Sequence, residues 1–170
     1  VFLLGAGQVH SQSGHAGGTP DFTLADSLQR ELEQSESDST GIRLMLKLAH
    51  EVMDTDSALA KSQILRAREI AELLPNTKAL GQSYQVMGEL QSYDGHYEEA
   101  VRQYDRALAY FSEADEDELF FETTRLKGNV YLFLSEYDQA VNLYNSALDF
   151  YRRNEMNIGN GGVYVGYSDK

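Results

Sequence analysis

The chain carries an internal repeat with a step of 40 residues. Its clearest marks are alanine pairs, seven residues apart within a pair: Ala60 with Ala67, Ala100 with Ala107, and Ala140 with Ala147. Glycine and tyrosine keep the same step, at Gly88 and Gly128, Tyr97 and Tyr137, and Tyr104 and Tyr144. A fixed period in this range is typical of stacked supersecondary units, which build surfaces for other molecules more often than catalytic sites.

Composition narrows the class of partner. The 170 residues are 42% hydrophobic, which excludes wholesale disorder, and they carry a formal net charge of −13. Such a charge disfavours nucleic acid and anionic membranes and favours a protein or peptide partner with basic groups. Cysteine is absent, so disulfides, thiolate zinc sites and a cysteine nucleophile are excluded.

The first 20 residues have the composition of a leader. Residues 1–7 form a short apolar run, and Val9 and Ser11 supply the small residues that signal peptidase accepts around a cleavage site after Ser11. The pattern predicts the remnant of a secretory signal peptide followed by a flexible leader. We therefore expect export to the periplasm or cell envelope; the alternative is a cytoplasmic protein with an ordinary N-terminal tail.

Apolar periodicity predicts helices throughout the rest of the chain. Thr23 or Asp26 can cap a short helix that runs to about Gln34, within an N-terminal segment of residues 21–40. Turn signals such as Pro75 with Asn76 then separate further helices. The helices after the first are expected at 42–53, 58–74, 77–93, 97–113, 117–134 and 137–153.

Small residues at fixed positions indicate close helix packing. Ala100, Tyr104 and Ala107 lie at i, i+4 and i+7, on one face of a helix. Gly88 and Gly128 fall in the middle of helices, where glycine costs about 1 kcal/mol against alanine. We infer that another backbone approaches both glycines, so closely that a side chain there would obstruct it.

These residues resemble the tetratricopeptide repeat (TPR), in particular the arrays of bacterial sensor kinases and regulators. The matching positions are Gly88, Gly95, Tyr97, Ala100, Tyr104 and Ala107, then Gly128, Tyr131, Tyr137, Ala140, Tyr144 and Ala147, with a weaker copy around Ala60, Ile64 and Ala67. The resemblance implies an all-α solenoid of antiparallel helix pairs with right-handed superhelical stacking. It also implies a non-catalytic module for protein–protein interaction.

Three TPR-like units are expected within residues 41–153, at about 41–75, 77–113 and 117–153. Residues 154–170 look like the start of a truncated or irregular further repeat, because Gly161 follows Gly128 after 33 residues instead of 40. A chain cut within a longer array is the favoured explanation.

The resemblance places a ligand groove on the first helix of each unit. The groove residues would be Gln82, Gln85, Glu89, Tyr93, Glu122, Arg125, Asn129 and Phe133. Arg125 and Asn129, at i and i+4, present a cation and an amide that together could hold a peptide carboxylate. A carboxylate clamp of the chaperone-binding kind would need matching groups in the neighbouring repeat, where Gln85 and Glu89 do not supply them. The alternative for Arg125 is a solvated helix face.

No pattern in the sequence indicates catalysis, a metal or a cofactor. The acidic run at 115–118 lacks the alternating ligands and glycine of a calcium loop, and is interpreted as a turn and a helix N-terminus. We therefore expect a non-enzymatic sensory or scaffolding part of a larger bacterial signalling protein. A self-associating scaffold, and hence a homo-oligomer, is the alternative, and an enzyme is the remote one.

Overall fold

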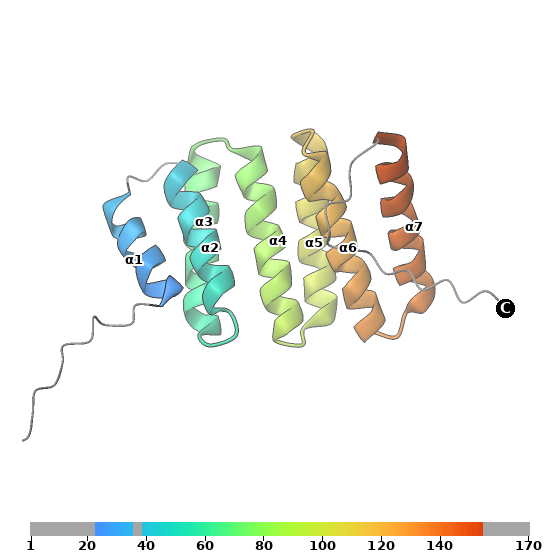
Figure 1. Ribbon diagram of the computed structural model, residues 1–170, viewed down its shortest axis with the longest axis horizontal. Coiled ribbons are helices and arrows are strands. Elements are labelled where there is room, and N and C mark those ends of the chain that lie inside the picture. Colours follow the sequence, from blue (N-terminus) through green and yellow to red (C-terminus); the bar gives the residue numbers. More distant parts are fainter. Residues whose placement is uncertain (1–22, 36–38, 155–170) are drawn as a thin grey trace, which may run out of the picture.

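The structure is a computed structural model that describes residues 23–35 and 39–154. These ranges form seven α-helices and contain no β-strand. In chain order the helices are α1 (Leu24–Gln34), α2 (Ser39–Val52), α3 (Ser57–Leu73), α4 (Thr77–Tyr93), α5 (Tyr97–Glu113), α6 (Asp117–Phe133) and α7 (Tyr137–Asn154). Each helix packs against the next along the chain, which confirms the predicted all-α solenoid (Figure 1). The predicted leader at 1–20 and the predicted further repeat, after Asn154, lie outside the described residues.

Side-chain caps mark the starts of α1, α3 and α4. At α1 the Thr23 hydroxyl accepts a hydrogen bond from the Asp26 amide (3.2 Å), and the Asp26 carboxylate accepts one from the Thr23 amide (3.0 Å). This reciprocal pair is a capping box. Asp56 and Asn76 cap α3 and α4 by accepting from the amide of the third helical residue, at 2.8 and 3.0 Å. From α3 onward every helix begins and ends within one residue of its predicted position.

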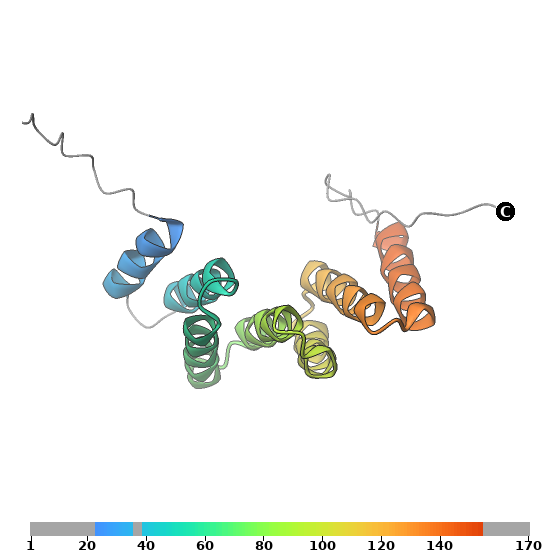
Figure 2. The same ribbon diagram turned by 90° about the horizontal axis from the view of Figure 1, so that it is seen from below.

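The inner side of the array is formed by α2, α4 and α6. Helix α2 contacts α4, and α4 contacts α6, whereas α3, α5 and α7 make no contact with one another in the described part. Helix pairs that touch along one side only must fan out on the other. Helices α2, α4 and α6 therefore lie toward the concave side, and α3 and α5 lie on the convex side (Figure 2).

The repeated glycines make room for the repeated tyrosines. A Cβ atom on Gly88 would lie 2.7 Å from Cε1 of Tyr104, and one on Gly128 would lie 2.7 Å from Cε1 of Tyr144. Real Cβ atoms do not approach a neighbour so closely, so each tyrosine ring occupies the space that the glycine leaves. In the first unit the same register positions hold Leu48 and Ile64, both buried. In that unit a leucine and an isoleucine share the space that a glycine and a tyrosine share in the later units, which keeps the packing dense.

Helix α1 covers the N-terminal end of the array. Its Leu28 and Leu32 are buried in one hydrophobic cluster with Ile42 and Leu48 of α2. That cluster continues through α3 to Met87 and Leu90 of α4. The described array therefore begins with a helix whose apolar face is used to close the core.

The last described helix, α7, lacks such a cover. In α5, Tyr97 stacks on Phe133 of α6 with ring centroids 5.3 Å apart, and Val101 packs in the cluster around Val130. The equivalent residues of α7, Tyr137 and Val141, are 62% and 50% exposed. The prediction that Tyr137 is a packing residue is therefore wrong within the described part, because no helix follows α7 there to pack against it.

Candidate ligand groove

All eight predicted groove residues lie on the inner helices α4 and α6, but they differ in accessibility. Four of them are half-buried: Gln82, Glu89, Glu122 and Asn129. Arg125 is also half-buried, while Tyr93 and Phe133 are exposed. The expectation that Gln85 points outward is wrong, since only 7% of it is exposed. Helix α4 has an inner helix on either side, which leaves Gln85 little access to solvent.

Arg125 is held by a carboxylate of its own helix. Its Nη2 lies 2.5 Å from Oε1 of Glu122 and its Nε lies 3.0 Å from Oε2, a two-point contact. The hydrogen bonds that Arg125 donates to Glu122 raise the pKa of Arg125, against the opposing effect of partial burial, and the charge of Glu89 adds to the rise. A ligand carboxylate would therefore have to displace Glu122. The predicted pairing of Arg125 with Asn129 for such a ligand has no support in this geometry.

Asn129 is engaged from α7. The hydroxyl of Tyr144 donates a hydrogen bond of 2.6 Å to its Oδ1. Partial burial raises the pKa of Tyr144. Tyr144 thus borders the polar surface around Asn129, although the sequence placed it only among the packing residues. The equivalent residue of the previous unit, Tyr104, is only 1% exposed, so the repeat pattern gave no indication of this second role.

His50 joins the groove from α2. Its Nε2 lies 3.3 Å from Oε2 of Glu89 on α4, and this contact links two inner helices. The hydrogen bond to Glu89 raises the pKa of His50, and Glu51 contributes through its charge. Sequence reasoning missed His50 because it has no metal-ligand spacing. The only indication in the sequence was that His50 follows Ala49, which lies 40 residues before the predicted groove residue Glu89.

Aromatic side chains border the groove where α4 and α6 end. Tyr93 and Phe133 are the last residues of these two helices and are 60% and 65% exposed. Both helices end at the same edge of the array (Figure 1). Exposed aromatic rings beside half-buried polar groups are the usual anchors of a protein interface.

A second cluster of charge and aromatic rings serves packing. The Arg68 guanidinium lies 3.9 Å from the centroid of the Tyr84 ring, and its Nε donates to the Ser83 hydroxyl (3.2 Å). Tyr84 stacks on Tyr110 with centroids 5.5 Å apart. Burial lowers the pKa of Arg68. This cluster joins α3, α4 and α5, and periodicity did not reveal it because Arg68 has leucine at the equivalent positions of the later units.

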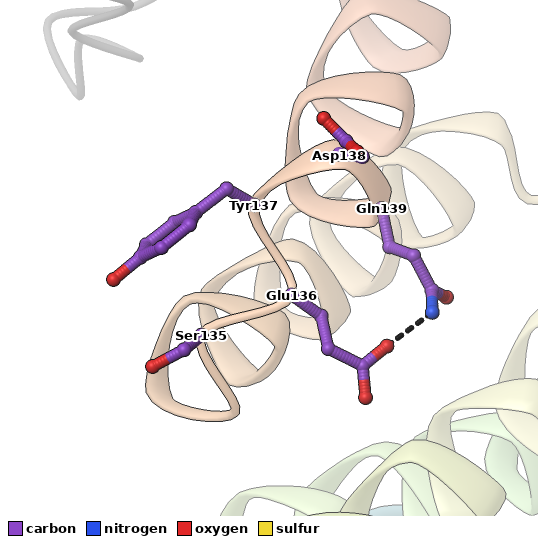
Figure 3. A pocket seen from close by; sticks show the side chains of 5 residues that line it. All are labelled: Ser135, Glu136, Tyr137, Asp138 and Gln139. Atoms are coloured by element: carbon purple, nitrogen blue, oxygen red, sulfur yellow. Dashed lines mark hydrogen bonds between the residues drawn. The ribbon is translucent and has the colours of Figure 1, made fainter.

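The turn between α6 and α7 forms an open recess lined by Ser135, Glu136, Tyr137, Asp138 and Gln139 (Figure 3). The carboxylate of Glu136 accepts a hydrogen bond from the Gln139 amide group, while the Tyr137 ring points away from both (Figure 3). The carboxylates of Glu136 and Asp138 disfavour the binding of an anion in this recess.

In the described ranges no three His, Asp or Glu side chains gather to hold a metal ion, and no helix is long and apolar enough to span a membrane.

Comparisons with known proteins add no family to this geometry. No protein-family model matches the chain, and no curated protein is similar to it in sequence. The helical array and its polar inner side are the features that bear on function.

Proposed function

We propose that the chain is a TPR-like, non-catalytic module that holds a segment of a partner protein along its concave side. The observation that carries this proposal is the gathering of polar groups from separate helices on that side. They are His50 of α2, Glu89 of α4, and Glu122, Arg125 and Asn129 of α6. Single surface charges need no explanation, but polar groups from successive inner helices, half-buried on α4 and α6 and exposed at His50, are what an extended ligand would cross.

The charge of the groove favours a partner with lysine or arginine. In the free protein Glu122 holds the cation of Arg125, and Glu89 is contacted by His50, which is a cation when protonated. A basic side chain can replace these internal cations without leaving a carboxylate unpaired, which is the costly outcome in a half-buried site. The net charge of −13 adds long-range attraction for the same class of ligand.

A peptide-selection experiment tests the groove. Peptides selected from a random library against the chain should be enriched in lysine and arginine. Glu89→Gln should weaken their binding at least tenfold, whereas Glu98→Gln, which removes the same charge from an exposed position on α5, should change it less than twofold. Equal effects of the two substitutions would assign the binding to net charge and would reject the groove.

We further propose that the module is the exported sensory or scaffolding part of a larger bacterial signalling protein. The support is the apolar run of residues 1–7 with the small residues Val9 and Ser11 behind it. The intact mass of natively expressed protein should place the mature N-terminus at Gln12. A cytoplasmic form that retains Val1 would contradict export and leave the binding proposal unaffected.

A further inference from the structure

The face of α7 that points away from α6 repeats a surface that is covered elsewhere in the molecule. On α5, Tyr97 and Val101 pack against α6. On α7, the residues one repeat later, Tyr137 and Val141, are 62% and 50% exposed. Helix α7 thus carries the packing surface of an internal helix, and no described helix covers it.

The spacing of this surface fits a helix that runs in the opposite direction. Tyr137, Val141, Tyr144 and Leu148 follow one another at steps of four, three and four residues, which is the spacing of a two-helix seam. Tyr137 and Val141 are exposed, whereas Tyr144 and Leu148 are half-buried and Tyr144 lies at the border with α6, beside Gly128. On α5, Tyr97, Val101 and Tyr104 of the equivalent stripe already pack against an antiparallel neighbour, since α6 follows α5 directly and returns along it (Figure 1). An antiparallel helix with a similar stripe is therefore the expected occupant.

We propose that the open face of α7 packs antiparallel against the same face of a second copy of this chain, and so forms a homodimer. A two-fold axis near Tyr144 would bring Val141 of each copy opposite Leu148 of the other, so the stripe is self-complementary. The same axis brings the Tyr137 ring toward Arg152 of the second copy, a favourable contact between an aromatic face and a guanidinium.

Charge and position support a second copy as the occupant. The chain as a whole carries −13, but α7 is formally neutral, with Asp138 and Asp149 against Arg152 and Arg153. Two copies that meet through α7 therefore avoid the repulsion that other acidic surfaces would impose. Helix α7 stands at one end of the described array, and α1 to α6 extend away from its open face (Figures 1 and 2).

Sedimentation across a concentration series tests the dimer. The wild-type chain should pass from monomer to dimer, and Val141→Asp should raise the dissociation constant at least tenfold with unchanged helicity, because Val141 is already half exposed. Gln139→Asp is the matched control. It adds the same charge to an exposed residue about 200° around the helix from Val141, and it should leave dimerisation within twofold.

Directed disulfides locate the contact, because the natural chain contains no cysteine. A mixture of the Val141→Cys and Leu148→Cys variants should form a disulfide-linked heterodimer much faster than Gln139→Cys mixed with Leu148→Cys. A chain that stays monomeric at all concentrations, or that dimerises equally well with Val141→Asp, would overturn the proposal. Protection of the introduced thiol of the Val141→Cys variant from a thiol reagent in a monomer would also overturn it, since residues outside the described part would then cover the face. Basic-peptide binding should survive Val141→Asp, so the dimer and the groove can fail independently.

Discussion

The second and third units share one packing motif but bury it to different extents. In the unit of α4 and α5, Tyr104 fills the space left by Gly88 and is 1% exposed, because α6 lies over it. In the unit of α6 and α7, Tyr144 fills the same space beside Gly128 but remains partly open, and its hydroxyl reaches Asn129.

Each unit therefore determines the fit within its own helix pair, whereas the next helix determines how far that pair is buried. Equivalent residues of successive units therefore contribute different amounts to the free energy of unfolding. Stability in such arrays is a sum of terms within units and terms between neighbours, and the two tyrosines separate these terms.

The largest expected effect is on the tyrosines. Tyr104→Ala should lower the free energy of unfolding by about 3–5 kcal/mol, as for a fully buried aromatic residue. Tyr144→Ala should lower it by about 1–2 kcal/mol, since part of that ring already faces solvent. Urea denaturation followed by circular dichroism measures both values, and equal losses would contradict the unequal burial of the two tyrosines.

A smaller effect is expected at the alanines, where the two units should agree. Ala100 and Ala140 are both fully buried within their own helix pairs. Ala100→Leu and Ala140→Leu should each cost about 1–3 kcal/mol through overpacking. Ala109→Leu, at an exposed position of α5, should stay within about 0.5 kcal/mol. Similar melting shifts for all three variants would refute the repeat register.

The glycines should again differ between units. At Gly88 a new methyl group meets a ring that α6 holds in place, so Gly88→Ala should be destabilising by about 1 kcal/mol after the gain in helix propensity. At Gly128 the ring of Tyr144 can turn toward its open side, so Gly128→Ala should be neutral or stabilising by up to about 1 kcal/mol. Thermal melts of the two variants test this order, and the reverse order would contradict it.

The smallest expected effect is the pH dependence of the contact between α2 and α4. The pKa of His50 is raised by Glu89 above its ordinary value of 6.5. Its contribution is therefore complete below pH 6.5 and is lost as the pH rises through the raised pKa. His50→Gln should lower stability at pH 5.5 by less than about 0.5 kcal/mol, because the His50 side chain is largely exposed, and the loss should be smaller at pH 8.5. A larger loss at pH 8.5 would contradict the charged pair.

Local signals in the sequence were sufficient for the elements of the fold. Pro75, Asn76 and Asp56 interrupt the helical pattern where the structure has its turns and caps. The 40-residue step correctly predicted a close approach at Gly88 and Gly128, although the approaching group is a tyrosine ring and not the predicted backbone. Both predictions depend on contacts within a turn or a helix pair, which a sequence pattern records directly.

Properties set by neighbouring units were beyond the sequence. Gln85 and Arg125 share a register position, yet Gln85 is buried between two inner helices and Arg125 is not. The hydrogen bond from Tyr144 to Asn129 and the contact of His50 with Glu89 also depend on how successive helices are placed. A periodic pattern shows which face of a helix packs, but not how far the next unit covers it.

The separation of the outer helices has a mechanical consequence. Because α3, α5 and α7 do not touch one another, the distances between these outer helices can change while α2, α4 and α6 stay in contact. Such bending changes the length of the array without exposing Ala60, Ala100 or Ala140 inside the helix pairs. The array is therefore expected to bend easily, and the ligand on its concave side is expected to set its length.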